Sequence, residues 1–154
     1  MTHSILFVCL GNICRSPMAE GAMRAAAEAR GIDIHIDSAG TGSWHIGDPP
    51  DSRAQAAARA NGVEISGQQA RQISASDFDH FHHILAMDGS VLGDLALIQR
   101  PQSPAALSLF LDHLPGREGQ DVADPYYGGD DGFQTVWDDV AAGAEALLDL
   151  ITAR

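Results

Sequence analysis

Short apolar runs alternate with amphipathic segments along the chain, and this order predicts strands that alternate with helices. A short run of aliphatic residues is typical of a buried strand, whereas apolar residues at steps of three and four are typical of a helix. Glycine and proline residues follow several of these segments and mark where they end. The pattern predicts strands at 4–9, 32–37, 83–87 and 107–111, helices at 17–30, 51–61, 88–98 and 131–152, and a short helical piece at 77–78.

Strands that alternate with helices imply a parallel sheet with helices on both faces. We therefore expect an α/β fold with a four-stranded, twisted parallel sheet, in one domain over residues 1–154. Ligands of such sheets bind beyond the carboxyl ends of the strands, and the first predicted strand ends at Cys9. The most regular helix is the last, whose apolar residues are Phe133, Val136, Trp137, Val140, Ala144, Leu147, Leu148 and Ile151.

The loop after the first strand has the composition of an anion-binding site. Residues 9–15 contain a glycine and an asparagine, which tolerate unusual backbone dihedrals. Ser16 suits a helix N-cap and Pro17 suits the first helical position, so we expect the helix to begin there. A helix N-terminus offers an anion unpaired N–H groups and the positive end of the helix dipole.

A cysteine and an arginine flank this loop, and together they indicate phosphate chemistry. The N–H groups of the loop and the helix favour the thiolate form of Cys9 over the thiol. A thiolate that attacks a phosphate dianion meets like charge, and the planar cation of Arg15 can offset it in bidentate geometry. Ser16 can donate to the sulfur when it leaves. A buried structural cysteine is the alternative for one residue alone, but the string from Cys9 to Pro17 disfavours it.

Charge narrows the choice of partners. The chain has 154 residues, of which 45% are hydrophobic and 19% are charged, and its net charge is −12. All 9 basic residues are arginines. Nucleic acids and anionic membranes both require a basic face, so we expect neither as a partner. An anionic substrate approaches against this overall field, so its site must be positive locally.

The sequence favours a cytoplasmic protein without metal. It shows no secretory signal pattern, and no apolar run reaches the roughly 20 residues that a membrane helix needs. The 2 cysteines are too few for a disulfide scaffold and suit a reducing compartment. Cys9 and Cys14 lack the spacing of zinc ligands, and His80, His82 and His83 fit a solvated turn before a strand.

A second loop carries a candidate acid and aromatic side chains. The run D-P-Y-Y-G-G begins at Asp124, with a proline that stiffens one side and glycines that free the other. An acid on a mobile loop can protonate a leaving phenolate oxygen, although an aspartate before proline is also an ordinary turn residue. Trp44, Tyr126 and Tyr127 lie in loops rich in glycine and proline, where they are either the walls of an aryl slot or scattered aromatics.

Several motifs occur in one order along the chain. They are V-C-L-G-N-I-C-R-S-P at 8–17, D-S-A-G-T at 37–41, the block 44–53, A-R-Q at 70–72, M-D at 87–88 and D-P-Y-Y at 124–127. Together they resemble the low-molecular-weight protein tyrosine phosphatases over nearly the whole chain. The resemblance implies a Rossmann-like four-stranded sheet and hydrolysis of protein phosphotyrosine and small aryl phosphates. It implies a phosphocysteine on Cys9, phosphate binding by Arg15, and Asp124 as general acid and base.

The resemblance extends these expectations to further residues and partners. It implies phosphotyrosine proteins as substrates, inorganic phosphate or another oxyanion in the loop, no cofactor and no metal; we expect a monomer. The phosphate-binding loop would be Leu10, Gly11, Asn12, Ile13, Cys14 and Ser16. The substrate crevice would be Leu10, Trp44, Tyr126 and Tyr127. Residues that support the site would be Ser38, Asp51, Arg53, Gln68 and Asp88.

Two positions raise questions within the resemblance. Family members often have a histidine before the A-R-Q block that joins a hydrogen-bond network holding the loop, whereas this chain has Gln68, which can still form a hydrogen bond. Cys14 corresponds to a second cysteine that protects the nucleophile Cys9 through a reversible disulfide. A small buried side chain is the alternative for Cys14.

Three other functions remain open. Related protein-arginine phosphatases carry threonine at the place of Ile13, and an apolar residue there favours phosphotyrosine. An arsenate reductase on the same fold needs a relay of further cysteines, and none follows Cys14. A phosphopeptide-binding module without catalysis is disfavoured because Cys9, Arg15 and Asp124 are all retained.

Overall fold

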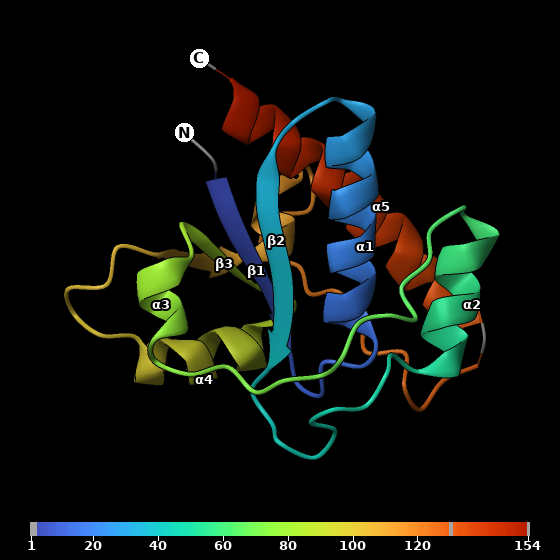
Figure 1. Cartoon of the computed structure of the whole chain (residues 1–154), viewed down its shortest axis with the longest axis horizontal. Helices are drawn as coiled ribbons and strands as arrows, with labels where there is room; N and C mark the ends of the chain where they lie inside the picture. Colours follow the sequence, from blue (N-terminus) through green and yellow to red (C-terminus); the bar gives the residue numbers. More distant parts are fainter. Residues whose placement is uncertain (1–2, 130, 154) are drawn as a thin grey trace.

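The computed structural model describes residues 3–129 and 131–153, and its strands form one parallel sheet (Figure 1). All strand pairings in this sheet are parallel. The predicted fold, a four-stranded parallel sheet with flanking helices, is confirmed. The strands, in their order across the sheet, are β2 (Ile34–Gly40), β1 (His3–Cys9), β3 (His83–Ala86) and β4 (Ala106–Leu109).

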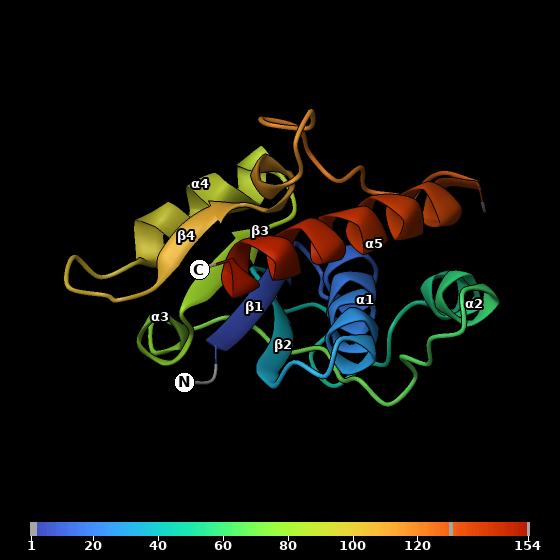
Figure 2. The ribbon, with the colours of Figure 1, turned by 90° about the horizontal axis from the view of Figure 1, so that it is seen from above.

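Helices cover both faces of the sheet, as Figures 1 and 2 show from two directions. On one face, α1 (Arg15–Ala29) packs beside α5 (Asp131–Thr152), and α2 (Ser52–Ala60) lies against both. On the other face lie α3 (Asp77–His80) and α4 (Gly89–Ile98). None of the helices among the described residues is long and apolar enough to cross a membrane.

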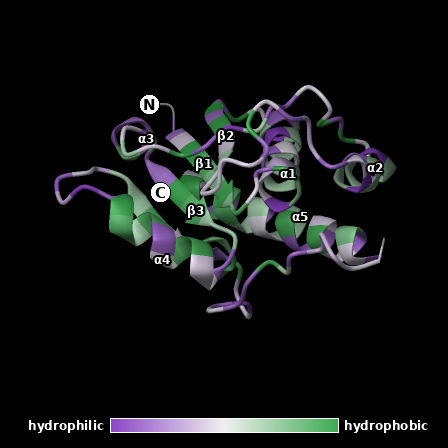
Figure 3. Cartoon of the chain, turned by 90° about the horizontal axis from the view of Figure 1, so that it is seen from below, coloured by the Kyte–Doolittle hydropathy of each residue, from purple (hydrophilic) through white to green (hydrophobic). Residues whose placement is uncertain are grey.

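The alternation of side chains along β1 explains why both faces are covered. Ile5 and Phe7 are buried in the cluster that includes α1 and α5, whereas Leu6 and Val8 are buried in the cluster that includes α3 and α4. A central parallel strand buries both faces, so its sequence is a continuous apolar run. Figure 3 shows this hydrophobic colouring on the strands between the helices.

Two predicted boundaries near the site are wrong. We expected Ser16 to cap the first helix, but α1 begins at Arg15, its N-cap is Cys14, and no side chain caps it. The Ser16 hydroxyl instead contacts residues of the loop. We also expected a loop from 38 onward, but β2 continues to Gly40 because parallel pairing with β1 extends to Cys9.

The end of the fourth strand also differs from the prediction. We expected a strand at 107–111, but β4 ends at Leu109 and a 3-10 helix, η1 (Phe110–His113), follows. Phe110 and Leu111 are buried in the cluster that includes α5. Their apolar character therefore reflects packing of this short helix, and a short apolar run alone does not separate the two cases.

Candidate active site

A crevice opens beyond the carboxyl end of β1, at the edge of the sheet where ligand sites of such folds lie. Cys9, Arg15 and Asp124 line it together, although they are far apart in the sequence. The predicted nucleophile, cation and acid are thus brought to one place. The other lining residues are Leu10, Gly11, Ile13, Cys14, Trp44, His45, Tyr126 and Tyr127.

Two polar groups contact the sulfur of Cys9. The backbone N–H of Asn12 donates to Sγ at 3.2 Å, and the Ser16 hydroxyl lies 3.0 Å from it. Asn12 adopts the left-handed conformation with φ of 57°, which asparagine tolerates better than most residues. This conformation turns the loop so that its N–H reaches the sulfur.

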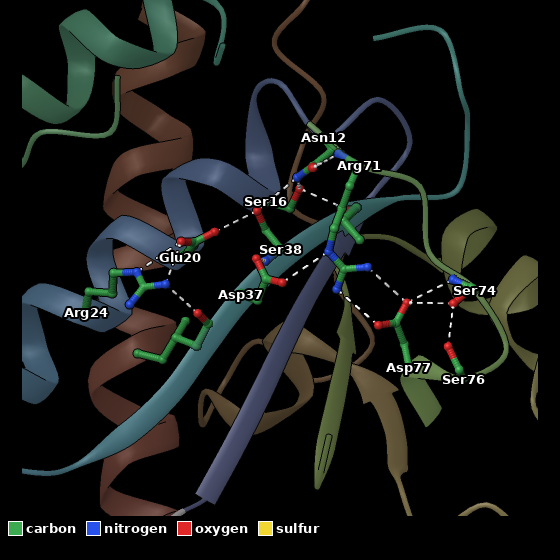
Figure 4. A network of polar contacts seen from close by, with 12 residues as sticks. Asn12, Ser16, Glu20, Arg24, Asp37, Ser38, Arg71, Ser74, Ser76 and Asp77 are labelled. Carbon is green, nitrogen blue, oxygen red and sulfur yellow. Dashed lines mark hydrogen bonds and ion pairs between the residues drawn. The ribbon is translucent and has the colours of Figure 1, made fainter. Parts of the chain in front are cut away.

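The Asn12 amide fixes the direction of the surrounding hydrogen bonds (Figure 4). Its Oδ1 accepts from the backbone N–H of Arg71 at 3.0 Å, so its Nδ2 faces the hydroxyls of Ser16 and Ser38 at 2.8 and 3.0 Å. Ser16 then accepts from Asn12 and keeps its own proton for another acceptor. Two acceptors lie within reach of the Ser16 hydroxyl: Cys9 Sγ at 3.0 Å and the Ala39 carbonyl at 3.4 Å. Cys9 Sγ is the nearer of the two.

A buried carboxylate, Glu20, closes this network at its far end. The hydroxyl of Ser38 donates to Glu20 Oε1 at 2.8 Å, and Arg24 Nε donates to Oε2 at 3.0 Å (Figure 4). Burial raises the pKa of Glu20 above its usual range, although the hydrogen bond from Ser38 and the ion pair with Arg24 act in the opposite direction. Glu20 thus gives the proton of Ser38 an acceptor away from Asn12.

Arg15 is a buried cation whose position is fixed by other residues. One of its amino groups donates to Asp88 at 2.6 Å and to the Val122 carbonyl at 3.1 Å. The other lies 3.7 Å from a carboxylate oxygen of Asp124. Burial lowers the pKa of Arg15, but Cys9, Asp88 and Asp124 outweigh it and leave that pKa raised. The guanidinium is therefore charged and held at the crevice.

Asp88, just beyond the end of β3, contacts the cation of the crevice. Its Oδ1 accepts from the backbone N–H of Val91 at 2.8 Å and caps α4, while its Oδ2 accepts from Arg15. One carboxylate thus joins the start of a helix to the cation of the crevice.

Asp124 lines the crevice together with the aromatic residues. Its side chain is 46% exposed, and its Oδ1 accepts from the N–H of Tyr126 at 3.1 Å. The rings of Tyr126 and Tyr127 meet edge to face with their centroids 4.9 Å apart. Tyr127 is 95% and Trp44 70% exposed, so these rings stand free to contact a ligand rather than filling the core.

Asp51 and Arg53 connect the two loops of the crevice. The N–H of Asp51 donates to the Ile13 carbonyl at 2.8 Å, and its carboxylate caps α2 by accepting from the N–H of Arg53. The Arg53 guanidinium lies 5.4 Å from the ring centre of Tyr126 and 4.6 Å from that of Phe133. This cation–π stacking orients the tyrosine wall relative to α5.

Cys14 and Gln68 take less direct positions. Burial, with a smaller effect of Asp51, raises the pKa of the Cys14 thiol to about 12. Both cysteines are free and buried, so the disulfide remains a prediction. Gln68 donates to the carbonyl of Pro17 at 3.1 Å, at the start of α1, and its buried Oε1 has no hydrogen-bond partner among residues 3–129 and 131–153.

The described part of the chain contains no group of three or more histidine, cysteine, aspartate or glutamate residues placed to hold a metal ion. His80 and His82 instead bond to the backbone of Ser76 and Ser4.

Comparison with known proteins identifies the family. The family described as "Low molecular weight phosphotyrosine protein phosphatase" matches residues 4–154. The chain belongs to this family. Its relatives include the low molecular weight protein-tyrosine-phosphatase YfkJ of Bacillus subtilis, 43% identical over 147 residues, which are 94% of this chain and 93% of YfkJ. The low molecular weight phosphotyrosine protein phosphatase of Homo sapiens is 40% identical over 152 residues, which are 96% of this chain and 95% of the human protein.

Solved structures of the family have the same fold. The crystal structure of YfkJ superposes with a TM-score of 0.91, at 41% identity over 98% of this chain and 95% of that chain. The drosophila arginine phosphatase DARP also has a TM-score of 0.91, at 32% identity, covering 97% of this chain and 98% of that chain. Fold similarity alone therefore does not separate phosphotyrosine from phosphoarginine as substrate.

Three residues of the phosphatase site were missed by sequence reasoning. Glu20 and Arg71 act through long-range contacts with Ser38 and Asn12, which helical periodicity does not reveal. His45 lines the crevice, and its Nδ1 lies 3.2 Å from Asp48. It follows Trp44 directly, and that neighbour was the available signal.

We predict that Glu20→Ala destabilises the phosphatase by about 2 kcal/mol, because it removes a buried acceptor and leaves the Ser38 hydroxyl without one. It should also lower kcat, since Ser38 and Asn12 lose their fixed geometry. Glu20→Gln keeps an oxygen that accepts from Ser38, so it should lose less stability and less kcat than Glu20→Ala. Urea unfolding and turnover of p-nitrophenyl phosphate measure the two effects.

The matched control is Glu28→Ala on the same helix, since Glu28 is exposed. It should change the free energy of unfolding by less than about 0.5 kcal/mol. Equal effects of the two alanine substitutions would show that Glu20 does not hold the network.

Proposed function

We propose that this crevice hydrolyses protein phosphotyrosine, and small aryl phosphate monoesters, through a phosphocysteine intermediate on Cys9. The observation that carries the proposal is the convergence of Cys9, Arg15 and Asp124 on one crevice. Membership of the low-molecular-weight protein-tyrosine phosphatase family supports the same enzyme class. A crystal structure of a protein tyrosine phosphatase from Entamoeba histolytica has Hepes in its active site, and that protein is 35% identical to this chain with a TM-score of 0.91 over 97% of both chains.

In the first step, Cys9 Sγ attacks phosphorus, so that an S–P bond forms while the bond from phosphorus to the phenol oxygen breaks. Arg15 and the N–H groups of the loop bind the non-bridging oxygens, which carry the charge of the transition state. Asp124 donates its proton to the leaving phenol oxygen. Its partial exposure and its distance of 3.7 Å from Arg15 leave it beside the place where phosphate would lie.

In the second step, Asp124 takes a proton from a water molecule that attacks phosphorus. The S–P bond breaks, inorganic phosphate forms, and the electron pair returns to Cys9 as a thiolate. The Ser16 hydroxyl and the Asn12 N–H stabilise that thiolate as it leaves, because both already face the sulfur.

The walls of the crevice favour an aryl phosphate. Trp44, Tyr126 and Tyr127 offer ring surfaces to a flat aromatic group, and Ile13 adds an apolar side chain from the loop itself. An arginine phosphate would instead need polar partners for its guanidinium nitrogens. We therefore favour phosphotyrosine over phosphoarginine as the substrate. We also propose that the enzyme acts as a monomer with a single domain over residues 1–154. A reducing cytoplasm suits it, because Cys9 and Cys14 are free thiols.

We predict that Cys9→Ser abolishes turnover of p-nitrophenyl phosphate, because a serine hydroxyl lacks the nucleophilicity of a thiolate, while binding of inorganic phosphate by the loop survives. Stopped assays and phosphate titration measure the two properties. Cys14→Ser, the same chemical change in the same loop, should keep measurable turnover even if the loop is perturbed, because the Cys14 sulfur does not attack phosphorus. Full activity of Cys9→Ser would contradict the proposal, as would faster turnover of phosphoarginine than of phosphotyrosine peptides by the unaltered enzyme.

We predict that Asp124→Ala slows hydrolysis of phenyl phosphate about 100-fold or more, because a poor leaving group depends most on the proton donor. Hydrolysis of esters with good leaving groups, such as p-nitrophenyl phosphate, should slow less. A series of aryl phosphates of graded leaving-group basicity measures the dependence. Glu118→Ala, an exposed acid in the segment before Asp124, is the control. An unchanged dependence would show that another residue is the acid.

A further inference from the structure

A second groove adjoins the crevice on the side of α4. Leu10 and Trp44 line both the groove and the crevice, so that they form the wall between them. From this wall the groove continues over Gln72 and Ile73 to Asp94 and Ile98. A peptide whose phosphotyrosine fills the crevice must leave it past one of its rims, and this groove begins at such a rim.

The wall between the two hollows is apolar and held in place. The ring of Trp44 lies on the backbone of Gly42, where a Cβ atom would be only 1.9 Å from its Cζ3. Trp44 is 70% exposed and Leu10 44%, and the two lie together at the rim, where adjoining exposed apolar side chains are typical of interaction sites. Ile98, one turn after Asp94 on α4, continues this apolar surface and is 40% exposed.

The groove has one charged group, and its charge is negative. Asp94 is the only charged residue among those that line it, and no arginine or histidine does. Asp94 is exposed, and within the described residues no donor or cation is recorded at its carboxylate. By contrast, Asp88 and Asp124 both face Arg15 in the crevice. The carboxylate of Asp94 is therefore available to a cation from outside.

We propose that this groove binds an arginine or lysine side chain next to the phosphotyrosine of a peptide substrate. The proposal rests on the phosphotyrosine hydrolysis proposed above and names the substrates of that same site. The aliphatic stem of such a side chain packs on Leu10 and Ile98, its cation stacks on the ring of Trp44, and its charge meets Asp94. An extended peptide advances about 3.3 Å per residue, so the first or second neighbour of the phosphotyrosine lies at this rim.

The overall charge acts in the same direction. With a net charge of −12, the enzyme repels peptides rich in acidic residues and attracts basic ones. A partly exposed ion pair and a cation–π contact are each modest, so we expect a preference of about fivefold in kcat/KM for arginine over alanine at the favoured position. The preference should weaken as salt concentration rises, because salt screens exposed charges.

The test compares phosphotyrosine peptides that carry arginine, alanine or glutamate at each of the two positions on either side of the phosphotyrosine. For each enzyme variant, kcat/KM of the peptide is divided by kcat/KM of p-nitrophenyl phosphate, so that a general change in catalysis cancels. The unaltered enzyme should prefer arginine to alanine and alanine to glutamate at one position. Asp94→Asn should lose most of the arginine preference, and Asp94→Lys should favour glutamate.

Glu28→Gln is the matched control, because it also removes one exposed negative charge and lies 13 positions after Arg15 on α1, about 20 Å along the helix. It should keep the preference of the unaltered enzyme. Equal kcat/KM for arginine and alanine peptides would overturn the inference, as would a preference that survives Asp94→Asn. The phosphotyrosine hydrolysis itself would fail separately, through absence of turnover with both the peptides and p-nitrophenyl phosphate.

Discussion

The orientation of the Asn12 amide is the constraint on which the geometry of the nucleophile depends. The N–H of Arg71 can only donate, so Asn12 must present Oδ1 to it and Nδ2 to the serines. The Ser38 hydroxyl donates a hydrogen bond to Glu20, and the Ser16 hydroxyl, which accepts from Asn12, is left to donate to the sulfur of Cys9. The hydrogen bonds from Arg71 through Asn12 and Ser16 thus all point the same way, and the last one is accepted by the Cys9 sulfur. A sulfur that accepts a hydrogen bond has its lone pair available to attack phosphorus.

The backbone N–H of Arg71, which sets the orientation of the Asn12 amide, is itself held in place by the Arg71 side chain. The guanidinium of Arg71 donates to Asp37 and to both carboxylate oxygens of Asp77, so its backbone is fixed at the position where its N–H meets Asn12 (Figure 4). Asp77 begins α3, on the face of the sheet opposite α1. Residues on both faces of the sheet therefore determine the shape of one loop.

A second constraint is the local positive charge in an acidic protein. Arg15 is only 3% exposed, and a buried guanidinium is stable only when its donors are satisfied. Asp88 and the Val122 carbonyl satisfy one side, which leaves the other directed toward the crevice near Asp124. The anion site is thus produced by a few fixed contacts and does not require a basic surface.

Much of this arrangement could be predicted from the sequence, because apolar runs and helical periodicity report burial directly. Local patterns alone predicted the strand that ends at Cys9 and the helix at 131–152. The predicted bounds of this helix are those of α5 in the structure. The extension of β2 through Ala39 and Gly40 was missed, because alanine and glycine are uncommon in strands and only pairing with β1 makes them extended.

Residues that act through distant contacts were also missed. Glu20 lies on a helix whose polar positions normally face solvent, and nothing local indicates that Ser38 will meet it. Ser16 has the composition of a helix cap, but the loop uses its hydroxyl for Cys9. In both cases a tertiary contact outweighs a local preference, and such contacts concentrate at the functional site.

Folding makes Cys9 the reactive cysteine by turning polar groups toward its sulfur, while Cys14 remains a buried, unreactive thiol. Burial raises the pKa of Cys14 to about 12, so this residue stays protonated, whereas the Asn12 N–H and the Ser16 hydroxyl lie within hydrogen-bond distance of the Cys9 sulfur. The most direct measurement is alkylation of the folded protein by iodoacetamide at neutral pH, followed by peptide mapping. We predict rapid modification of Cys9 with Cys14 intact in the folded protein, and similar slow rates for both cysteines in urea. Modification of Cys14 as fast as Cys9 in the folded protein, or of Cys9 at its unfolded rate, would contradict it.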